Sequence, residues 1–322
     1  MTRRQIASRA PSSAPKQPAN GNGSARVVIG FPAASPLARY IGWPIIRSEM
    51  EVRDSQYTKG ISAPNRRRLD LVHRSLAGPF SVKQAARALG LPAAEAPKLL
   101  ARWREQGWLT RVRRGLYVAV PLGADAAASN ADPWTILTRA FGPCYIGGWS
   151  AAEHWGLTEQ LFRSTVVLTT RNVRPREGQL NGLRYLAKRV PQGRLYGTKR
   201  IWRDQVPVEI SDPARTLVDV LDDPRLGGGI RHVAGIVDAY FKSEQRADAI
   251  LLDYAGRYGR GVVFKRLGFL VSELAVEAPD VIAACRNGLS EGYSRLDPTG
   301  PKRGRLVRRW RLQVNATIPK AE

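Results

Sequence analysis

Apolar residues recur at helical spacing from about residue 65 onward. One face of a predicted helix is formed by residues at positions i, i+3, i+4 and i+7, namely Leu69, Val72, His73 and Leu76. Asn65 is the expected N-cap of this helix, and Gly78-Pro79 should end it. Because His73 belongs to the apolar face, the pattern predicts a packed histidine.

Two further helices are predicted before residue 107. The capping-box pattern Ser81-Val-Lys-Gln84 opens the second helix, and Gly90 is placed to end it. The third has an apolar stripe made of Ala96, Leu99, Leu100 and Trp103. Proline fits easily only in the first turn of a helix, and Pro97 therefore predicts a start near Ala94. Gly107 should end this helix.

The stretch GWLTRVRRGLYVA, residues 107–119, predicts a β-hairpin. Alternation places Trp108, Thr110 and Val112 on one face of the first strand, and Leu109, Arg111 and Arg113 on the other. Arg114-Gly115 suits the turn because glycine accepts a positive φ. The second strand carries Leu116, Val118 and Val120. Three short helices followed by a hairpin predict a winged helix-turn-helix.

A longer region of mixed pattern follows. Asp132-Pro133 and Asp212-Pro213 are favoured helix starts, and Ser150-Ala-Ala-Glu153 repeats the capping-box pattern. Strands are predicted at 164–170, 183–190 and 206–211, helices over most of 229–288, and strand character at 305–315. The expected fold class is α+β. We expect a disordered basic tail (1–60), a winged helix (61–121), a short linker and a larger α+β domain (132–316).

The net charge of the chain favours a polyanionic partner. The 322 residues carry a formal net charge of +24 and are 43% hydrophobic, which suits folded domains that bind nucleic acid or, less often, an anionic membrane surface. Cys144 and Cys285 form no metal pattern and favour a reducing compartment, the cytoplasm. No apolar run reaches the ~18 residues of a membrane span. The amino-terminal segment lacks the apolar core of a secretory signal; its basic, Ser-rich composition bears a slight likeness to a transit peptide.

Basic side chains are concentrated in the predicted winged helix. We call the following nine the basic winged-helix residues: Arg66, Arg67, Arg68, Lys83, Lys98, Arg102, Arg111, Arg113 and Arg114. A charge run is usually a solvated face, but three clusters together favour DNA. In winged helices the third helix enters the major groove while other elements contact phosphates. Lys98 and Arg102 suit guanine and Glu95 suits cytosine, although phosphate contacts and helix stabilisation explain them as well.

A second basic group lies near the carboxyl end of the chain. We call it the C-terminal arginines: Arg303, Arg305, Arg308, Arg309 and Arg311, with Trp310 among them. Charges on an edge strand protect it from pairing with another chain, which is one interpretation. A surface for nucleic acid or for an acidic protein partner is the other, and the sequence does not separate the two.

Signals for catalysis are weak. The three histidines and two cysteines lack zinc spacing, and Gly227-Gly228-Gly229 lacks the Lys-Ser/Thr of a phosphate loop, so it predicts a turn before a helix. Carboxylates that could bind metal in a nuclease are Asp212, Asp219, Asp222, Asp223, Asp253 and Glu273. Asp212 is better explained as a cap, and Asp222-Asp223-Pro224 as a helix end. We expect no catalytic residues, cofactor or metal; a DNA-targeted metal-dependent nuclease is the alternative.

Several segments, in order, resemble the AbiEi family of antitoxins. They are GWLTRVRRGLYVAVP, YIGGWSAAEHWGLTEQ, VEISDPARTLVDVLDDPRLGGG, FKRLGFLVSEL and SRLDPTGPKRGRLVRRWRLQVN. With the helices before the first of them, the resemblance covers roughly residues 65–315. The resemblance implies a bacterial type IV toxin–antitoxin (abortive infection) protein that defends against phage. It implies a winged helix that represses its own operon and a C-terminal domain that opposes a nucleotidyltransferase toxin of the AbiEii type. It also implies no catalytic residues. A winged helix that binds only protein is a third interpretation.

Overall fold

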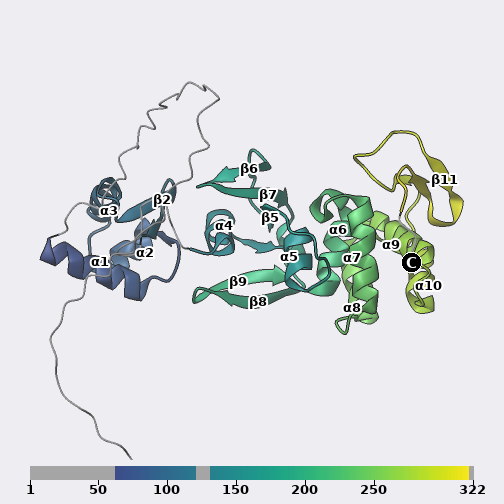
Figure 1. Ribbon diagram of the computed structural model, residues 1–322, viewed down its shortest axis with the longest axis horizontal. Helices are drawn as coiled ribbons and strands as arrows, with labels where there is room; N and C mark the ends of the chain where they lie inside the picture. Colours follow the sequence, from purple (N-terminus) through teal and green to yellow (C-terminus); the bar gives the residue numbers. More distant parts are fainter. Residues whose placement is uncertain (1–61, 121–130, 319–322) are drawn as a thin grey trace, which may run out of the picture. The chain divides into compact units, whose positions relative to one another are not determined.

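The computed structural model describes residues 62–120 and 131–318 (Figure 1). The expected tail (1–60) and the linker after residue 120 lie outside these residues, and the proposed domain division stays a prediction. The described chain mixes helices with three sheets, so the α+β fold class is confirmed.

The first helix, α1 (Ala63–Ser75), begins earlier than its sequence pattern predicts. Its N-cap is Ser62, because Pro64 occupies the first turn with a φ already suited to a helix, so the predicted Asn65 cap is wrong. Leu69 and Val72 are buried, whereas His73 is exposed. Each residue turns the helix by about 100°. His73 therefore falls at the edge of the narrow buried stripe, and the packed-histidine prediction is wrong.

The caps of α2 (Val82–Leu89) are confirmed. The Ser81 hydroxyl accepts a hydrogen bond from the Gln84 amide at 3.3 Å, and the Gln84 side chain accepts one from the Ser81 amide at 2.9 Å. Gly90 follows with φ +61°, the left-handed conformation expected after a helix. These reciprocal bonds satisfy amides that would otherwise lack partners at the start of the helix.

Helix α3 (Ala96–Glu105) starts two residues later than predicted. Residues 93–95 form a turn, in which the Glu95 amide donates to the Pro92 carbonyl at 3.0 Å. Pro97 thus lies in the first turn, where its missing N–H costs no helical bond.

A three-stranded sheet completes this part of the fold, with strand order β1-β3-β2. Its members are β1 (Phe80–Ser81), β2 (Leu109–Arg113) and β3 (Leu116–Ala119), and β1 was not predicted. With α1–α3 it forms the arrangement of a winged helix. The β2–β3 register shifts between Arg111 and Arg113, which is a bulge at Val112. Arg111 and Arg113, predicted on one face, lie opposite Tyr117 and Leu116, which pack in different clusters, so the predicted strict alternation along β2 fails at the bulge.

The second sheet has six strands in the order β6-β7-β5-β4-β9-β8. They are β4 (Cys144–Ile146), β5 (Ser164–Thr169), β6 (Glu177–Leu180), β7 (Leu183–Arg189), β8 (Thr198–Arg203) and β9 (Val206–Ser211). The predicted strands at 164–170, 183–190 and 206–211 are confirmed. The pairs β4–β9 and β5–β7 are parallel, and the other neighbouring pairs are antiparallel.

Helices cover both faces of this sheet. Val167 of β5 packs with α4 (Pro133–Phe141), whereas Val166 and Leu168 pack with α6 (Pro213–Asp222) in the main core. Asp132 and Asp212 cap these two helices as predicted. The predicted cap at Ser150 is wrong, because Ser150 lies inside α5 (Gly148–His154). Its buried hydroxyl accepts a hydrogen bond from the Val166 amide at 3.0 Å and so ties α5 to the sheet.

Residues beyond 222 form a helical layer followed by a small sheet. The helices are α7 (Ile230–Lys242), α8 (Asp248–Tyr258), α9 (Gly261–Glu273) and α10 (Pro279–Asn287). The sheet consists of β10 (Ser294–Arg295), β11 (Arg305–Val307) and β12 (Leu312–Val314). Short 3₁₀ turns are η1 (Gln192–Arg194), η2 (Pro224–Gly227) and η3 (Arg308–Trp310). Over the described ranges, every helix is too short or too polar to span a bilayer.

The small sheet is anchored on α9 by a tryptophan. Trp310 is 2% exposed, and its ring lies against Gly268, where a Cβ atom would overlap the ring. Only a residue without a side chain allows this close approach. Gly235, in the middle of α7, is exposed and has open space around the position of a Cβ atom.

We expect Gly268→Ala to lower the free energy of unfolding by about 2 kcal/mol, because the added methyl group overpacks the core. Gly235→Ala is the matched control. It should raise stability by about 0.5–1 kcal/mol, since alanine loses less entropy than glycine in a helix. Urea denaturation of both variants measures the difference. Equal effects of the two substitutions would contradict the packing of Trp310 on Gly268.

Candidate nucleic-acid interface

All nine basic winged-helix residues are exposed. They lie on α1, α2, α3, β2 and the turn after β2. Within residues 62–120 and 131–318, none of the nine forms an ion pair with a carboxylate. Positive charges without internal partners are available to an external anion.

Helix α3 has one buried and one charged face. Ala96, Leu100 and Trp103 are fully buried, with Leu100 and Trp103 packed in the core of the winged helix. Lys98 and Arg102, one turn apart, are exposed. Packing of the apolar face therefore holds both cations toward solvent, as the sequence predicts for a helix that enters a groove.

The bulge at Val112 orients the wing arginines. Arg111 lies opposite Tyr117 and Arg113 lies opposite Leu116, so Val112 is the extra residue and turns inward. Arg111 and Arg113 are both left exposed. Gly115 takes φ +79° in the turn after Arg114, as expected for a tight hairpin. The local backbone thus presents three arginines around one buried valine.

Arg171 adds a charge to this region that sequence reasoning missed. The pKa of Arg113 is lowered by partial burial and by the neighbouring positive charge of Arg171. The Arg171 amide donates to the Thr169 hydroxyl at 3.0 Å, just after β5. A single arginine after a strand carries no sequence signal. Two like charges held near each other are stabilised when an anion binds between or beside them.

The C-terminal arginines surround the small sheet and are all exposed. Arg309 stacks over the Trp310 ring at 5.3 Å, and the Arg311 side chain donates to the Ser290 carbonyl at 3.1 Å. The 305–315 strand prediction is confirmed in part, because η3 interrupts it. Edge protection and partner binding both remain compatible with this exposure.

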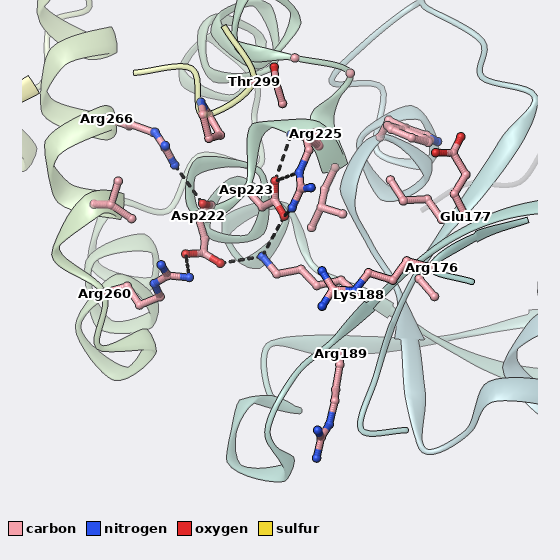
Figure 2. Close-up of a pocket in the computed structure, with 18 of the residues that line it drawn as sticks. Arg176, Glu177, Lys188, Arg189, Asp222, Asp223, Arg225, Arg260, Arg266 and Thr299 are labelled. Carbon is pink, nitrogen blue, oxygen red and sulfur yellow. Dashed lines mark hydrogen bonds and ion pairs between the residues drawn. The ribbon is translucent and has the colours of Figure 1, made fainter. Parts of the chain in front are cut away.

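The candidate metal-binding carboxylates do not assemble into one site. Asp212 caps α6, accepting from the Arg215 amide at 2.8 Å, and only Asp222 and Asp223 line a common cavity (Figure 2). Their oxygens are engaged by Lys188, Arg225 and Arg260. In the described ranges, no group of three or more His, Cys, Asp or Glu side chains is arranged to hold a metal ion. This part of the chain offers no observation that favours the nuclease alternative.

The Asp219 carboxylate forms a buried ion pair with Arg215. Its carboxylate lies 3.1 Å from the Arg215 guanidinium and accepts from the Tyr145 hydroxyl at 2.9 Å, and both charged side chains are fully buried. The Arg215 guanidinium also stacks near the rings of Tyr196 and Tyr258, at 4.4 and 4.9 Å. Burial raises the pKa of Asp219, while the Arg215 charge opposes the rise. This pair is structural.

We expect Arg215→Met to cost about 3–5 kcal/mol of unfolding free energy, because it leaves the Asp219 carboxylate buried without its partner. Lys242→Met is the matched control, since it breaks the exposed Lys242–Asp238 pair, which has the same i, i+4 spacing. That loss should be about 0.5 kcal/mol or less. Thermal and urea unfolding compare the two. A loss for Arg215→Met no larger than the control would refute the structural assignment.

Part of this chain matches a family of known proteins. Residues 67–120 match the model of a family described as "Transcriptional regulator, AbiEi antitoxin", which confirms the resemblance over this segment. No curated protein matches the chain. The fold is similar to the crystal structure of the RV2827C protein from Mycobacterium tuberculosis, with a TM-score of 0.56 and 15% sequence identity. The match covers 79% of this chain and 92% of that chain. At this identity the likeness concerns the fold alone.

Proposed function

We propose that this chain is a DNA-binding transcriptional autorepressor and the antitoxin of a type IV toxin–antitoxin (abortive infection) system. The observation that carries the proposal is the coincidence of two features in one segment. Residues 67–120 match a family of antitoxin transcriptional regulators, and the same segment holds α3 and the wing with exposed basic residues. The protein acts in the cytoplasm by binding, without catalysis.

The winged helix binds double-stranded DNA of its own operator. Helix α3 enters the major groove, with Lys98 and Arg102 at base edges or phosphates, while the wing arginines and Arg66–Arg68 hold the backbone. Lys83 on α2 adds a phosphate contact. Guanidinium groups pair well with phosphate oxygens, and each neutralised phosphate releases counterions. Affinity is therefore strongly salt-dependent.

The antitoxin activity belongs to residues 132–316, the proposed C-terminal domain. Its partner is a nucleotidyltransferase-type toxin encoded beside its own gene. Support comes from the antitoxin description of the matched family and from the ordered resemblance of segments up to residue 315. The C-terminal arginines are the candidate contact surface, because they are exposed charges around a well-anchored small sheet.

We expect the triple variant Arg111→Ala, Arg113→Ala, Arg114→Ala to bind DNA from upstream of its own gene more weakly than the unaltered chain does. Removal of three phosphate contacts should weaken binding at all sequences and reduce the slope of log K against log salt by about 3. A gel-shift titration at two or more salt concentrations, against scrambled DNA, measures both effects.

The control for this experiment removes the same charge elsewhere. Arg163, Arg184 and Arg286 are exposed and lie outside the winged helix, and their combined substitution by alanine should change upstream binding less than the wing variant. Equal losses in the two triple variants would mean that DNA responds to net charge only. That result would remove the wing from the proposed interface.

We expect the full chain to restore growth to cells that express the neighbouring nucleotidyltransferase toxin. The wing triple variant should still restore growth, because toxin neutralisation is assigned to the C-terminal domain, while it loses repression of a reporter placed behind the upstream DNA. Growth and reporter output are measured in the same strains. Absence of rescue by the unaltered chain would contradict the antitoxin half without touching the repressor half.

A further inference from the structure

A cavity of about 940 Å³ is lined by residues that all follow the winged helix in the sequence (Figure 2). It is lined by residues 186–189 of β7, the end of α6, the start of α7, part of α9 and residues near β10. Small-molecule sites typically occupy about 300–1,000 Å³. The cavity therefore has the size of a ligand site, and the DNA-binding proposal makes no use of it.

The lining carries an excess of positive charge. Its cations are Arg176, Lys188, Arg189, Arg225, Arg260 and Arg266, against the carboxylates of Glu177, Asp222 and Asp223. Even if each of these carboxylates neutralises one cation, three positive charges remain in the lining. In the described part of the chain, Arg176 and Arg189 have no carboxylate partner.

Three of the cations already converge on two carboxylates. Lys188 Nζ lies 2.6 Å from Asp222 and 3.6 Å from Asp223, Arg225 lies 2.8 Å from Asp223, and Arg260 lies 2.9 Å from Asp222. Figure 2 shows Lys188, Arg225 and Arg260 directed at these carboxylates and Arg189 directed away from them. A cluster of cations around oxygen anions is also the arrangement that receives phosphate oxygens.

Backbone groups at the start of α7 favour an anion independently. Gly228 and Gly229 line the cavity, and their own amides donate to the carbonyls of Arg225 and Pro224. Gly229 is the N-cap of this 13-residue helix, and no side chain of the described residues caps the amides of its first turn. The first amides of a helix point outward and carry partial positive charge, so they attract phosphate groups. An apolar part of the lining, Trp149, Leu226 and Val262, suits the body of an organic ligand.

We propose that this cavity binds a phosphorylated small molecule, with its phosphate groups between Lys188, Arg225, Arg176 and the N-terminus of α7. The positive excess matches the charge of a diphosphate or triphosphate. The concave shape and the volume exclude a duplex and fit a compact ligand. This binding is independent of operator recognition, so the two proposals fail or succeed separately.

Isothermal titration of the full chain with inorganic pyrophosphate and, separately, with ATP tests the proposal. We expect saturable binding at one site, weakened about tenfold or more in Arg176→Gln and in Arg225→Gln, because each removes a charge-assisted contact. Arg184→Gln is the matched control, since Arg184 is an exposed residue of β7 outside the lining. ATP bound more tightly than pyrophosphate would show that the apolar lining contributes; equal affinity would assign recognition to phosphate alone.

A second variant predicts a gain. Asp223→Asn keeps the shape of the side chain but removes a carboxylate that competes for Lys188 and Arg225, so affinity for pyrophosphate should rise about threefold or more. Absence of binding by both probes would overturn the proposal. Equal weakening by Arg176→Gln, Arg225→Gln and Arg184→Gln would also overturn it, because the response would then follow net charge. Gel shifts of the same variants with upstream DNA keep this result separate from operator binding.

Discussion

The guanidinium group of Arg266 joins three segments that are far apart in the sequence. It donates to the carbonyls of Leu221 and Asp222 at 2.7 and 2.9 Å and to those of Leu296 and Arg295 at 3.0 and 2.9 Å. The first two carbonyls lie in the last turn of α6, where no helical partner exists for them. Burial lowers the pKa of Arg266 to about 10, and the nearby Asp222 charge opposes this. An arginine of α9 thus caps α6 and holds the small sheet in place.

This cap fixes the position of Asp222, on which the neighbouring charges depend. With its backbone held by Arg266, the Asp222 carboxylate receives Lys188 from β7, Arg260 at the start of α9 and the Tyr258 hydroxyl from α8. A buried carboxylate is tolerated only with such partners. The cavity is built around this same carboxylate. Structural ion pairs and a candidate anion site therefore share one set of side chains.

Local signals predicted the elements that satisfy their own backbone groups. The capping box at Ser81, the Asp-Pro starts of α4 and α6 and the proline in the first turn of α3 all act within a few residues. Strands β1, β4, β6, β8 and β10 were missed. Strands β1, β4 and β10 pair with partners distant in sequence, whereas β6 and β8 contain few apolar residues. The bulge at Val112 was missed because both faces of the β1-β3-β2 sheet are covered, one by the helices of the winged helix and the other by α4, and that packing joins distant segments.

The candidate sites also differ in whether local sequence or contacts between distant segments determine them. Exposure of the basic winged-helix residues could be predicted, since a helix or hairpin with one apolar face leaves its charges outside. The effect of Arg171 on Arg113 and the assembly of the cavity could not be predicted, because each needs side chains from separate segments.

The free-energy cost of removing a charge from water explains where the arginines of this protein lie. Arg266 is buried against four carbonyl acceptors, and Arg215 is buried beside the Asp219 carboxylate although its Nε and Nη1 lack acceptors among the described residues. The wing arginines avoid the cost of desolvation by staying in water. The basic winged-helix residues and the C-terminal arginines, which are all exposed, therefore remain available to an external polyanion.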